Sequence, residues 1–198
     1  MVEQGRFVET QIEGTKVAIV FGDIVDQRVD AIVSAANERL KGGCGVDGAI
    51  HEAAGPKLSE ACRAIGFCET GDAVVTPGFS LRTRYIIHTV GPVYAAGEVN
   101  ELGKRHNEEA ALLLASCYKK SLELAMANGA RTIAFPAIST GEFEYPADRA
   151  TDVAMQSVKT FLQKNPGAFD EIRFVMFDDD YFGIGHRKLK EHFDISSL

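Results

Sequence analysis

The chain has 198 residues, 45% hydrophobic and 25% charged, which suits one globular α/β domain over residues 1–198 with a full core. A formal net charge of −7 without a lysine or arginine cluster argues against binding to double-stranded nucleic acid. No apolar run approaches the roughly 20 residues that cross a bilayer, and the N-terminal residues lack a signal-peptide pattern. We therefore expect a cytoplasmic monomer that binds neither nucleic acid nor membrane.

Apolar runs bounded by turn residues predict the strands. We expect them, in chain order, at 6–12, 16–22, 29–35, 72–78, 84–92, 131–139 and 171–178. The Glu13-Gly14-Thr15 connection between the first two is typical of a hairpin turn. The third run is apolar enough to be buried on both faces of a sheet.

Helical spacing of apolar residues predicts helices between these strands. We expect one from about Val46, and others at 56–66, 105–130, 146–165 and 185–193. Asn128-Gly129 would close the long helix, and Pro146 suits the first turn of the next one.

After the opening hairpin, strands alternate with helices. This order predicts a sheet that is parallel in its middle and covered by helices on both sides. Ligands of such folds bind beyond the carboxyl ends of the strands, so the functional loops should follow residues 22, 34, 91, 138 and 177.

The four cysteines show no disulfide framework, so we expect reduced thiols. Cys44 and His51 lie near a glycine-rich loop and raise the question of zinc, but no further ligand set is evident. We therefore expect neither a metal nor a cofactor. Cys44 is interpreted as a small apolar filler, His51 as a structural residue behind the loop, and His88 as a strand-end residue that holds backbone.

The glycine-rich loop contains Gly43-x-Gly45-x-x-Gly48, which matches GxGxxG. Two earlier strands and the intervening "NERLKG" argue against a dinucleotide-binding fingerprint. Glycines still let backbone approach a ligand, and free N–H groups at the next helix start can hold phosphate without a lysine. The alternative is a turn that needs glycine for structure alone.

Two polar residues flank this loop. Asp47 is either a first-turn aspartate favoured by the helix dipole or a functional carboxylate facing ribose or water. Asn37 is either a turn former or a contact to a sugar.

A second loop, "PAISTGEFEYP" (136–146), also follows a buried strand and precedes a helix. Ser139, Thr140 and Gly141 offer backbone donors there, and Phe143 offers an aromatic face. Ser139 as a hydrolase nucleophile would lack the GxSxG elbow. Two donor loops indicate a ligand with two phosphates.

Taken in order, the segments "GDIVDQRVDAIVSAAN", "GGCGVDGAIH", "YIIHTVGP", "IAFPAISTGEFEYP" and "FVMFD" resemble the macrodomain family, and "GGCGVDGAIH" with "AAGPKL" resembles its MacroD-type branch. The resemblance implies a three-layer α/β/α domain with a mixed, mostly parallel central sheet. It also implies ADP-ribose binding, and either removal of ADP-ribose from acidic side chains or deacetylation of O-acetyl-ADP-ribose.

The resemblance also implies roles for individual residues. Asp23 would accept a hydrogen bond from the adenine amine with Ile24 beside it, and Phe177 would lie against adenine. Asn37 would contact the distal ribose, and Asp47 would orient or activate water. The first phosphate loop would comprise Gly45, Val46 and Gly48, and the second Ser139, Thr140, Gly141, Glu142 and Phe143.

Two positions depart from the family pattern, which has asparagine in place of Ser34 and glycine in place of Glu144. At Ser34 we expect altered stability or geometry more than lost binding, whereas Glu144 either weakens diphosphate binding or points to solvent. Two other functions remain open beside the hydrolase: a non-catalytic ADP-ribose reader and a phosphatase acting on ADP-ribose 1''-phosphate.

Overall fold

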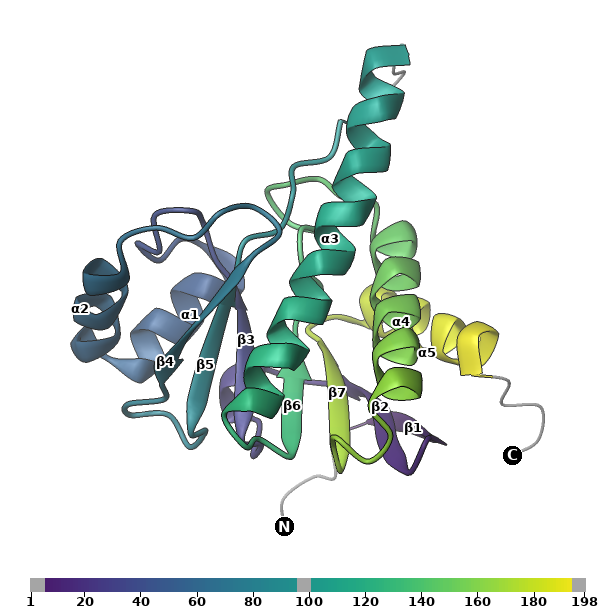
Figure 1. The fold of residues 1–198 in the computed structure, drawn as a ribbon, viewed down its shortest axis with the longest axis horizontal. Helices are drawn as coiled ribbons and strands as arrows, with labels where there is room; N and C mark the ends of the chain where they lie inside the picture. Colours follow the sequence, from purple (N-terminus) through teal and green to yellow (C-terminus); the bar gives the residue numbers. More distant parts are fainter. Residues whose placement is uncertain (1–5, 96–100, 194–198) are drawn as a thin grey trace.

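The computed structural model describes residues 6–95 and 101–193, which build a seven-stranded sheet between two layers of helices (Figure 1). The strands are β1 (Phe7–Ile12), β2 (Thr15–Phe21), β3 (Ala31–Ala35), β4 (Ala73–Pro77), β5 (Tyr85–Thr89), β6 (Thr132–Phe135) and β7 (Glu171–Met176). The helices are α1 (Gly45–Ala54), α2 (Pro56–Ile65), α3 (Glu101–Ala127), α4 (Ala147–Lys164) and α5 (Asp179–Phe193), with a short 3₁₀ helix η1 (Ile24–Asp26). In these residues, no helix has the length and apolarity to span a membrane.

The strand order is β1-β2-β7-β6-β3-β5-β4. The pairs in the middle of the sheet are parallel, and the outermost pairs, β1 with β2 and β4 with β5, are antiparallel. At the opening hairpin, Glu13 and Gly14 both have left-handed φ, 47° and 79°, as the tight turn between twisted strands requires. The predicted hairpin and the mixed, mostly parallel sheet are confirmed.

Each face of the sheet carries its own hydrophobic core because successive strand residues point to opposite faces. Ile133 and Phe135 pack under α3, α4 and α5, whereas Ala134 between them packs on the side of α1 and α2. The core under α3, α4 and α5 is the larger of the two. The α/β/α layering is therefore confirmed.

The long helix is placed slightly differently from the prediction. It begins at Glu101 rather than 105 and ends at Ala127 rather than 130. Beyond its end, Gly129 takes φ 68°, and the Ala130 amide donates to the Ala125 carbonyl at 3.0 Å. The predicted Asn128-Gly129 stop is thus confirmed as a left-handed glycine cap.

The predicted start of the last helix at 185 is wrong, since α5 begins at Asp179. Gly183 and Gly185 lower helix propensity there, but burial of Phe182 overrides it. The Asp178 carboxylate accepts the Tyr181 amide at 2.8 Å and so supports the early start. Pro146 stands just before α4, at its N-cap, rather than inside its first turn.

Three predicted strands are too long at their carboxyl ends. β5, β6 and β7 stop at Thr89, Phe135 and Met176, instead of 92, 139 and 178. Val90 and Ile138, which follow β5 and β6, are as buried as strand residues although they lie outside the strands, so a hydropathy pattern cannot distinguish them from strand. These segments form the loops described below.

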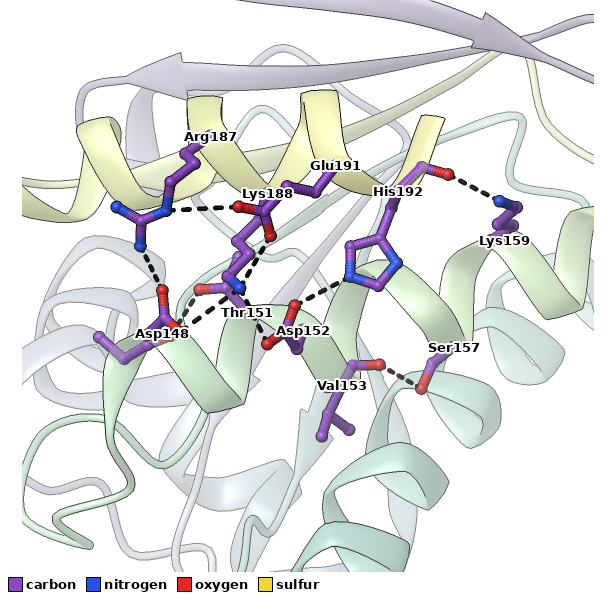
Figure 2. A network of polar contacts seen from close by, with 11 residues as sticks. Asp148, Thr151, Asp152, Val153, Ser157, Lys159, Arg187, Lys188, Glu191 and His192 are labelled. Atoms are coloured by element: carbon purple, nitrogen blue, oxygen red, sulfur yellow. Dashed lines mark hydrogen bonds and ion pairs between the residues drawn. The ribbon is translucent and has the colours of Figure 1, made fainter. Parts of the chain in front are cut away.

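A polar network fastens α5 to α4 (Figure 2). The ammonium of Lys188, whose side chain is only 9% exposed, lies 3.4 Å from Asp148, 3.0 Å from Asp152 and 2.9 Å from Glu191. His192 Nε2 lies 2.9 Å from the other Asp152 oxygen. The hydrogen bonds that Lys188 donates to Glu191 and the neighbouring aspartates raise the pKa of Lys188, so the buried cation is permanent at neutral pH.

Candidate functional site

A cleft of about 400 Å³ opens beyond the carboxyl ends of β3, β6 and β7. Among the described residues that line it there is no lysine, arginine or histidine, and its charged members, Glu142 and Asp178, are acidic. The lining comprises Ala35, Ala36, Cys44, Gly45, Val46, Gly91, Pro136, Ala137, Ser139, Thr140, Gly141, Glu142, Phe143, Val175, Met176, Phe177, Asp178 and Tyr181. An anion in this cleft would have to be held by backbone dipoles.

The first set of such dipoles is the start of α1. Cys44 occupies the N-cap position but makes no side-chain cap hydrogen bond, so the first N–H groups of the helix remain available. Gly45 opens the helix with φ 61°, a left-handed value suited to glycine, and both Gly45 and Val46 line the cleft. This is the geometry of an anion-binding helix terminus.

The second set is the loop after β6. In the described structure, no backbone amide of residues 139–143 donates a hydrogen bond. Contacts from outside hold the loop: the Tyr145 amide donates to the Ser139 carbonyl at 3.0 Å, and the Tyr181 hydroxyl to the Thr140 carbonyl at 3.1 Å. Ser139 has φ 67°, a strained value that tightly held functional loops tolerate. These five residues, Ser139, Thr140, Gly141, Glu142 and Phe143, all line the cleft.

Ser139 is poorly placed to be a nucleophile. Its hydroxyl is buried without a hydrogen-bond partner among the described residues, so no base activates it. The hydroxyl lies 2.1 Å from where a side chain on Gly91 would begin. Gly91 is therefore a lining residue that must be glycine, and the sequence analysis did not single it out.

Phe177 follows β7 directly and is 77% exposed at the cleft. An exposed phenyl ring at a cleft offers a stacking surface for a planar ligand group. Asp23 caps η1, since its carboxylate accepts the Val25 amide at 3.1 Å, and a carboxylate has capacity for further donors. Ile24 is buried in the smaller core, 3% exposed. Neither Asp23 nor Ile24 is among the residues that line the cleft.

Asp47 lies behind the cleft rather than in its wall, with 3% of its surface exposed. The Ser34 hydroxyl donates to Oδ1 at 2.7 Å, and His51 Nε2 lies 3.8 Å from the same oxygen. The second oxygen has no hydrogen-bond partner within the described chain. Burial raises the pKa of Asp47, and the Ser34 hydrogen bond and His51 only partly oppose this. A desolvated carboxylate with a raised pKa is suited to accept a proton.

Asn37 pins the loop that covers Asp47. Its amide nitrogen donates to the Gly42 carbonyl at 3.0 Å, and its oxygen accepts the Lys41 amide at 3.3 Å. Asn37 therefore does act as a turn former. Its second amide hydrogen has no acceptor among the described residues and can be donated to a ligand. A side chain on Gly43 would begin 3.8 Å from both Asn37 Nδ2 and Asp47 Oδ2, so this glycine leaves space in front of both groups.

Two glutamates of the second loop differ in position. Glu142 lines the cleft, whereas Glu144 is exposed to solvent outside it, with φ 52° where glycine would be unstrained. Of these two glutamates, it is therefore Glu142 that lies at the cleft.

The zinc hypothesis pairs Cys44 with His51, but the structure separates them. Cys44 contacts Glu142, whereas His51 lies with Cys62 and His88, one ligand atom of each within 4.8 Å of the others. Tetrahedral zinc would hold such atoms about 3.5 Å apart. His88 Nε2 already lies 2.9 Å from Thr76 Oγ, and burial lowers the pKa of His88 to about 4, as expected for a neutral core histidine. This cluster fits a structural role.

Gly48 does not line the cleft, but a side chain there would begin 2.4 Å from the Gly43 carbonyl oxygen. We expect Gly48→Ala to push the loop off α1 and lower the free energy of unfolding by about 2 kcal/mol, measured by urea titration. Gly183→Ala is the control, because the space around Gly183 is open. Equal stability of Gly48→Ala and the parent protein would contradict this steric role.

Comparison with known proteins shows which family the chain belongs to. A family profile described as Macro domain matches residues 33–154. The chain is 49% identical over 178 residues to the ADP-ribose glycohydrolase MACROD2 of Xenopus laevis, covering 90% of this chain but only 41% of that protein.

Solved structures from other organisms share the fold. The Oceanobacillus iheyensis macrodomain with ADP superposes with a TM-score of 0.87 at 37% identity, covering 97% of this chain and 99% of that one. The Trypanosoma brucei macrodomain in complex with ADP-ribose superposes with a TM-score of 0.80 at 38% identity, covering 94% and 75%. Sequence, fold and the amide-lined cleft lead to one conclusion: the chain belongs to the macrodomain family.

Proposed function

We propose that this protein binds ADP-ribose in the cleft and hydrolyses ester-linked ADP-ribose without a metal ion. The substrate would be mono-ADP-ribosylated aspartate or glutamate on proteins, or O-acetyl-ADP-ribose. The observation that carries the proposal is the pair of free amide sets, at the start of α1 and in residues 139–143, facing one cleft without basic side chains. Such amides bind a diphosphate as fixed dipoles. Two similar proteins support the assignment: one is named as an ADP-ribose glycohydrolase, and the other was solved in complex with ADP-ribose.

In the proposed reaction, water attacks the acyl carbon of the ester that joins the acid to the distal ribose, and Asp47 Oδ2 accepts a proton from this water. The bond between the acyl carbon and the ribose oxygen then breaks, and protonated Asp47 returns its proton to that oxygen, so the products are the free acid and the ribose hydroxyl. The space in front of Gly43 brings such a water within reach of both Asp47 and Asn37. Asn37 would orient the water or the ribose, and the clamped diphosphate would supply positioning, which is a large part of the rate in such reactions.

The direct experiment has two measurements. Calorimetry with ADP-ribose tests binding, and incubation with protein mono-ADP-ribosylated on acidic residues tests release of free ADP-ribose. We expect both to be positive, and we expect the release rate to survive dialysis against a chelator. Release of inorganic phosphate from ADP-ribose 1''-phosphate would instead indicate a phosphatase. Absence of ADP-ribose binding would refute the proposal.

Ser34→Ala tests the support of Asp47. Loss of the hydroxyl removes a hydrogen bond that favours ionised Asp47, so the pKa of this carboxyl should rise further. We expect the acidic limb of the pH–rate profile to move to higher pH, and stability at pH 7 to fall by about 1–2 kcal/mol. Ser34→Thr keeps a hydroxyl and should restore the profile. An unchanged profile in Ser34→Ala would exclude this role.

A non-catalytic ADP-ribose reader is the second candidate. The observation that favours it is the burial of Asp47 behind the cleft, 3% exposed. A reader would bind ADP-ribose in the calorimeter yet release none from the modified protein.

A further inference from the structure

A hydrogen bond between two side chains joins the start of α1 to the loop after β6 at the cleft. The Cys44 thiol, at the N-cap of α1, donates to Glu142 Oε1 in the opposite loop at 3.0 Å. Both residues line the cleft, and both are exposed. The carboxylate raises the pKa of the Cys44 thiol through this hydrogen bond, so the thiol keeps its proton and remains the donor at neutral pH.

This contact holds the Glu142 carboxylate at a cleft that is expected to bind an anion. Glu142 belongs to the second set of free amides, and its carboxylate contacts Cys44 at the start of α1, which carries the first set; these amides are the groups expected to hold the phosphates. No basic side chain among the described lining residues offsets this charge. A phosphate entering the cleft would therefore meet both attractive dipoles and a repulsive carboxylate.

The repulsion depends on how much charge the ligand carries. In ADP-ribose the two phosphates share an anhydride oxygen and each is also esterified to one ribose, so each bears a single charge. In ADP the terminal phosphate has no ester bond, and its second proton leaves with a pKa of about 6, as in a phosphate monoester, which adds about one charge at pH 8. A fixed carboxylate about 6 Å away in a half-exposed cleft changes the affinity for each added charge by about three- to tenfold.

We propose that Glu142, held across the cleft by Cys44, is a specificity-determining residue that selects internal diphosphates such as ADP-ribose over terminal phosphates such as ADP. The inference rests on the proposed function, since it places the diphosphate between these loops. The Oceanobacillus iheyensis relative was captured with ADP, so ADP is a relevant competitor for a cleft of this fold.

The test is the ratio of the dissociation constants of ADP and ADP-ribose, measured by calorimetry at pH 8 in about 50 mM salt. We expect Glu142→Gln to tighten ADP more than ADP-ribose, so that the ratio falls by about threefold or more. Because screening weakens the repulsion, the difference between parent and variant should shrink in about 0.5 M salt. An unchanged ratio in Glu142→Gln would overturn the inference.

Glu144→Gln is the matched control, because it removes the same charge from the same loop outside the cleft, and it should leave the ratio unchanged. Cys44→Ala removes the donor that fixes Glu142 and should lower the ratio part of the way, whereas Cys44→Ser keeps a donor and should preserve it. If Glu144→Gln lowered the ratio as much as Glu142→Gln, the net charge of the protein, and not the contact between Cys44 and Glu142, would set the selectivity.

The contact itself can be measured without any nucleotide. Of the four free cysteines, Cys44 is exposed and the other three are buried, so a thiol reagent such as Ellman's reagent should report on Cys44. We expect faster labelling in Glu142→Gln, since removal of the carboxylate lowers the thiol pKa. Faster labelling with no ADP-ribose binding would refute the proposed function and this inference with it. Normal binding with unchanged labelling and ratio would refute the inference alone.

Discussion

Asp47→Asn is expected to lower the rate of ADP-ribose release by about 10²–10⁴-fold while leaving ADP-ribose affinity nearly unchanged. The amide keeps the shape of the side chain but cannot take a proton from water. Affinity should persist because Asp47 lies behind the cleft and does not line it. Single-turnover release from modified protein and calorimetry would separate the two effects.

Asp47→Asn should not lower the melting temperature of the protein. An aspartate that served only to stabilise the fold would give the opposite result. Burial raises the folded-state pKa of Asp47, so its contribution to stability is present at low pH and is lost as pH rises through that raised pKa. Above that raised pKa the ionised group destabilises the folded state, so a neutral amide should match or raise the melting temperature. Glu52→Gln, on the exposed face of α1, is the control for a lost charge. A parental release rate in Asp47→Asn would show that another group activates the water.

Lys188→Met is expected to lower the free energy of unfolding at pH 7 by about 2 kcal/mol, equivalent to about 5 °C in melting temperature. Methionine keeps the apolar stem but removes the cation shared by Asp148, Asp152 and Glu191. The loss should stay below that of a fully buried pair, since these carboxylates are 41–49% exposed. Thermal and urea unfolding would measure it.

The pH dependence gives a second readout of this network. Burial opposes ionisation of Asp152, but hydrogen bonds from His192 and Lys188 outweigh it and lower the pKa of Asp152. Its contribution is present above the unfolded-state pKa and is lost as pH falls through the lowered value. The difference in the free energy of unfolding between the parent protein and Lys188→Met should therefore become smaller below about pH 4. Lys190→Met, at an exposed position of α5, should change little. A gap independent of pH would point to packing instead.

Much of the fold was predictable because local signals agree with the tertiary structure. The hairpin turn at Glu13 and Gly14 and the helix end at Gly129 depend mainly on neighbouring residues, and the apolar run of β3 already indicates a buried strand. The start of α5 was missed because it depends on a distant partner. Phe182 and Gly185 pack on residues of β2 and β7, and this gain outweighs the low helix propensity of two glycines.

The site shows the same division. The sequence predicted the glycine-rich loop and the loop after β6, because both have a distinctive composition and both follow buried strands. The hydrogen bonds from Ser34 to Asp47 and from Cys44 to Glu142 join residues 13 and 98 positions apart, and no spacing rule predicts them. Cys44, interpreted from sequence as an apolar filler, is an exposed hydrogen-bond donor. Glu142, not Glu144, lies in the cleft.

The unequal cores on the two sides of the sheet bear on how such a domain can diversify. The buried residues under α3, α4 and α5 supply most of the apolar contact, while Asp47 and the start of α1 rest on the smaller core with α2. Substitutions around Asp47 on the α1–α2 side therefore leave the larger core, which packs against the other face of the sheet, unchanged. If the proposed hydrolysis takes place at this site, its leaving group can change during evolution while the core under α3, α4 and α5 stays the same.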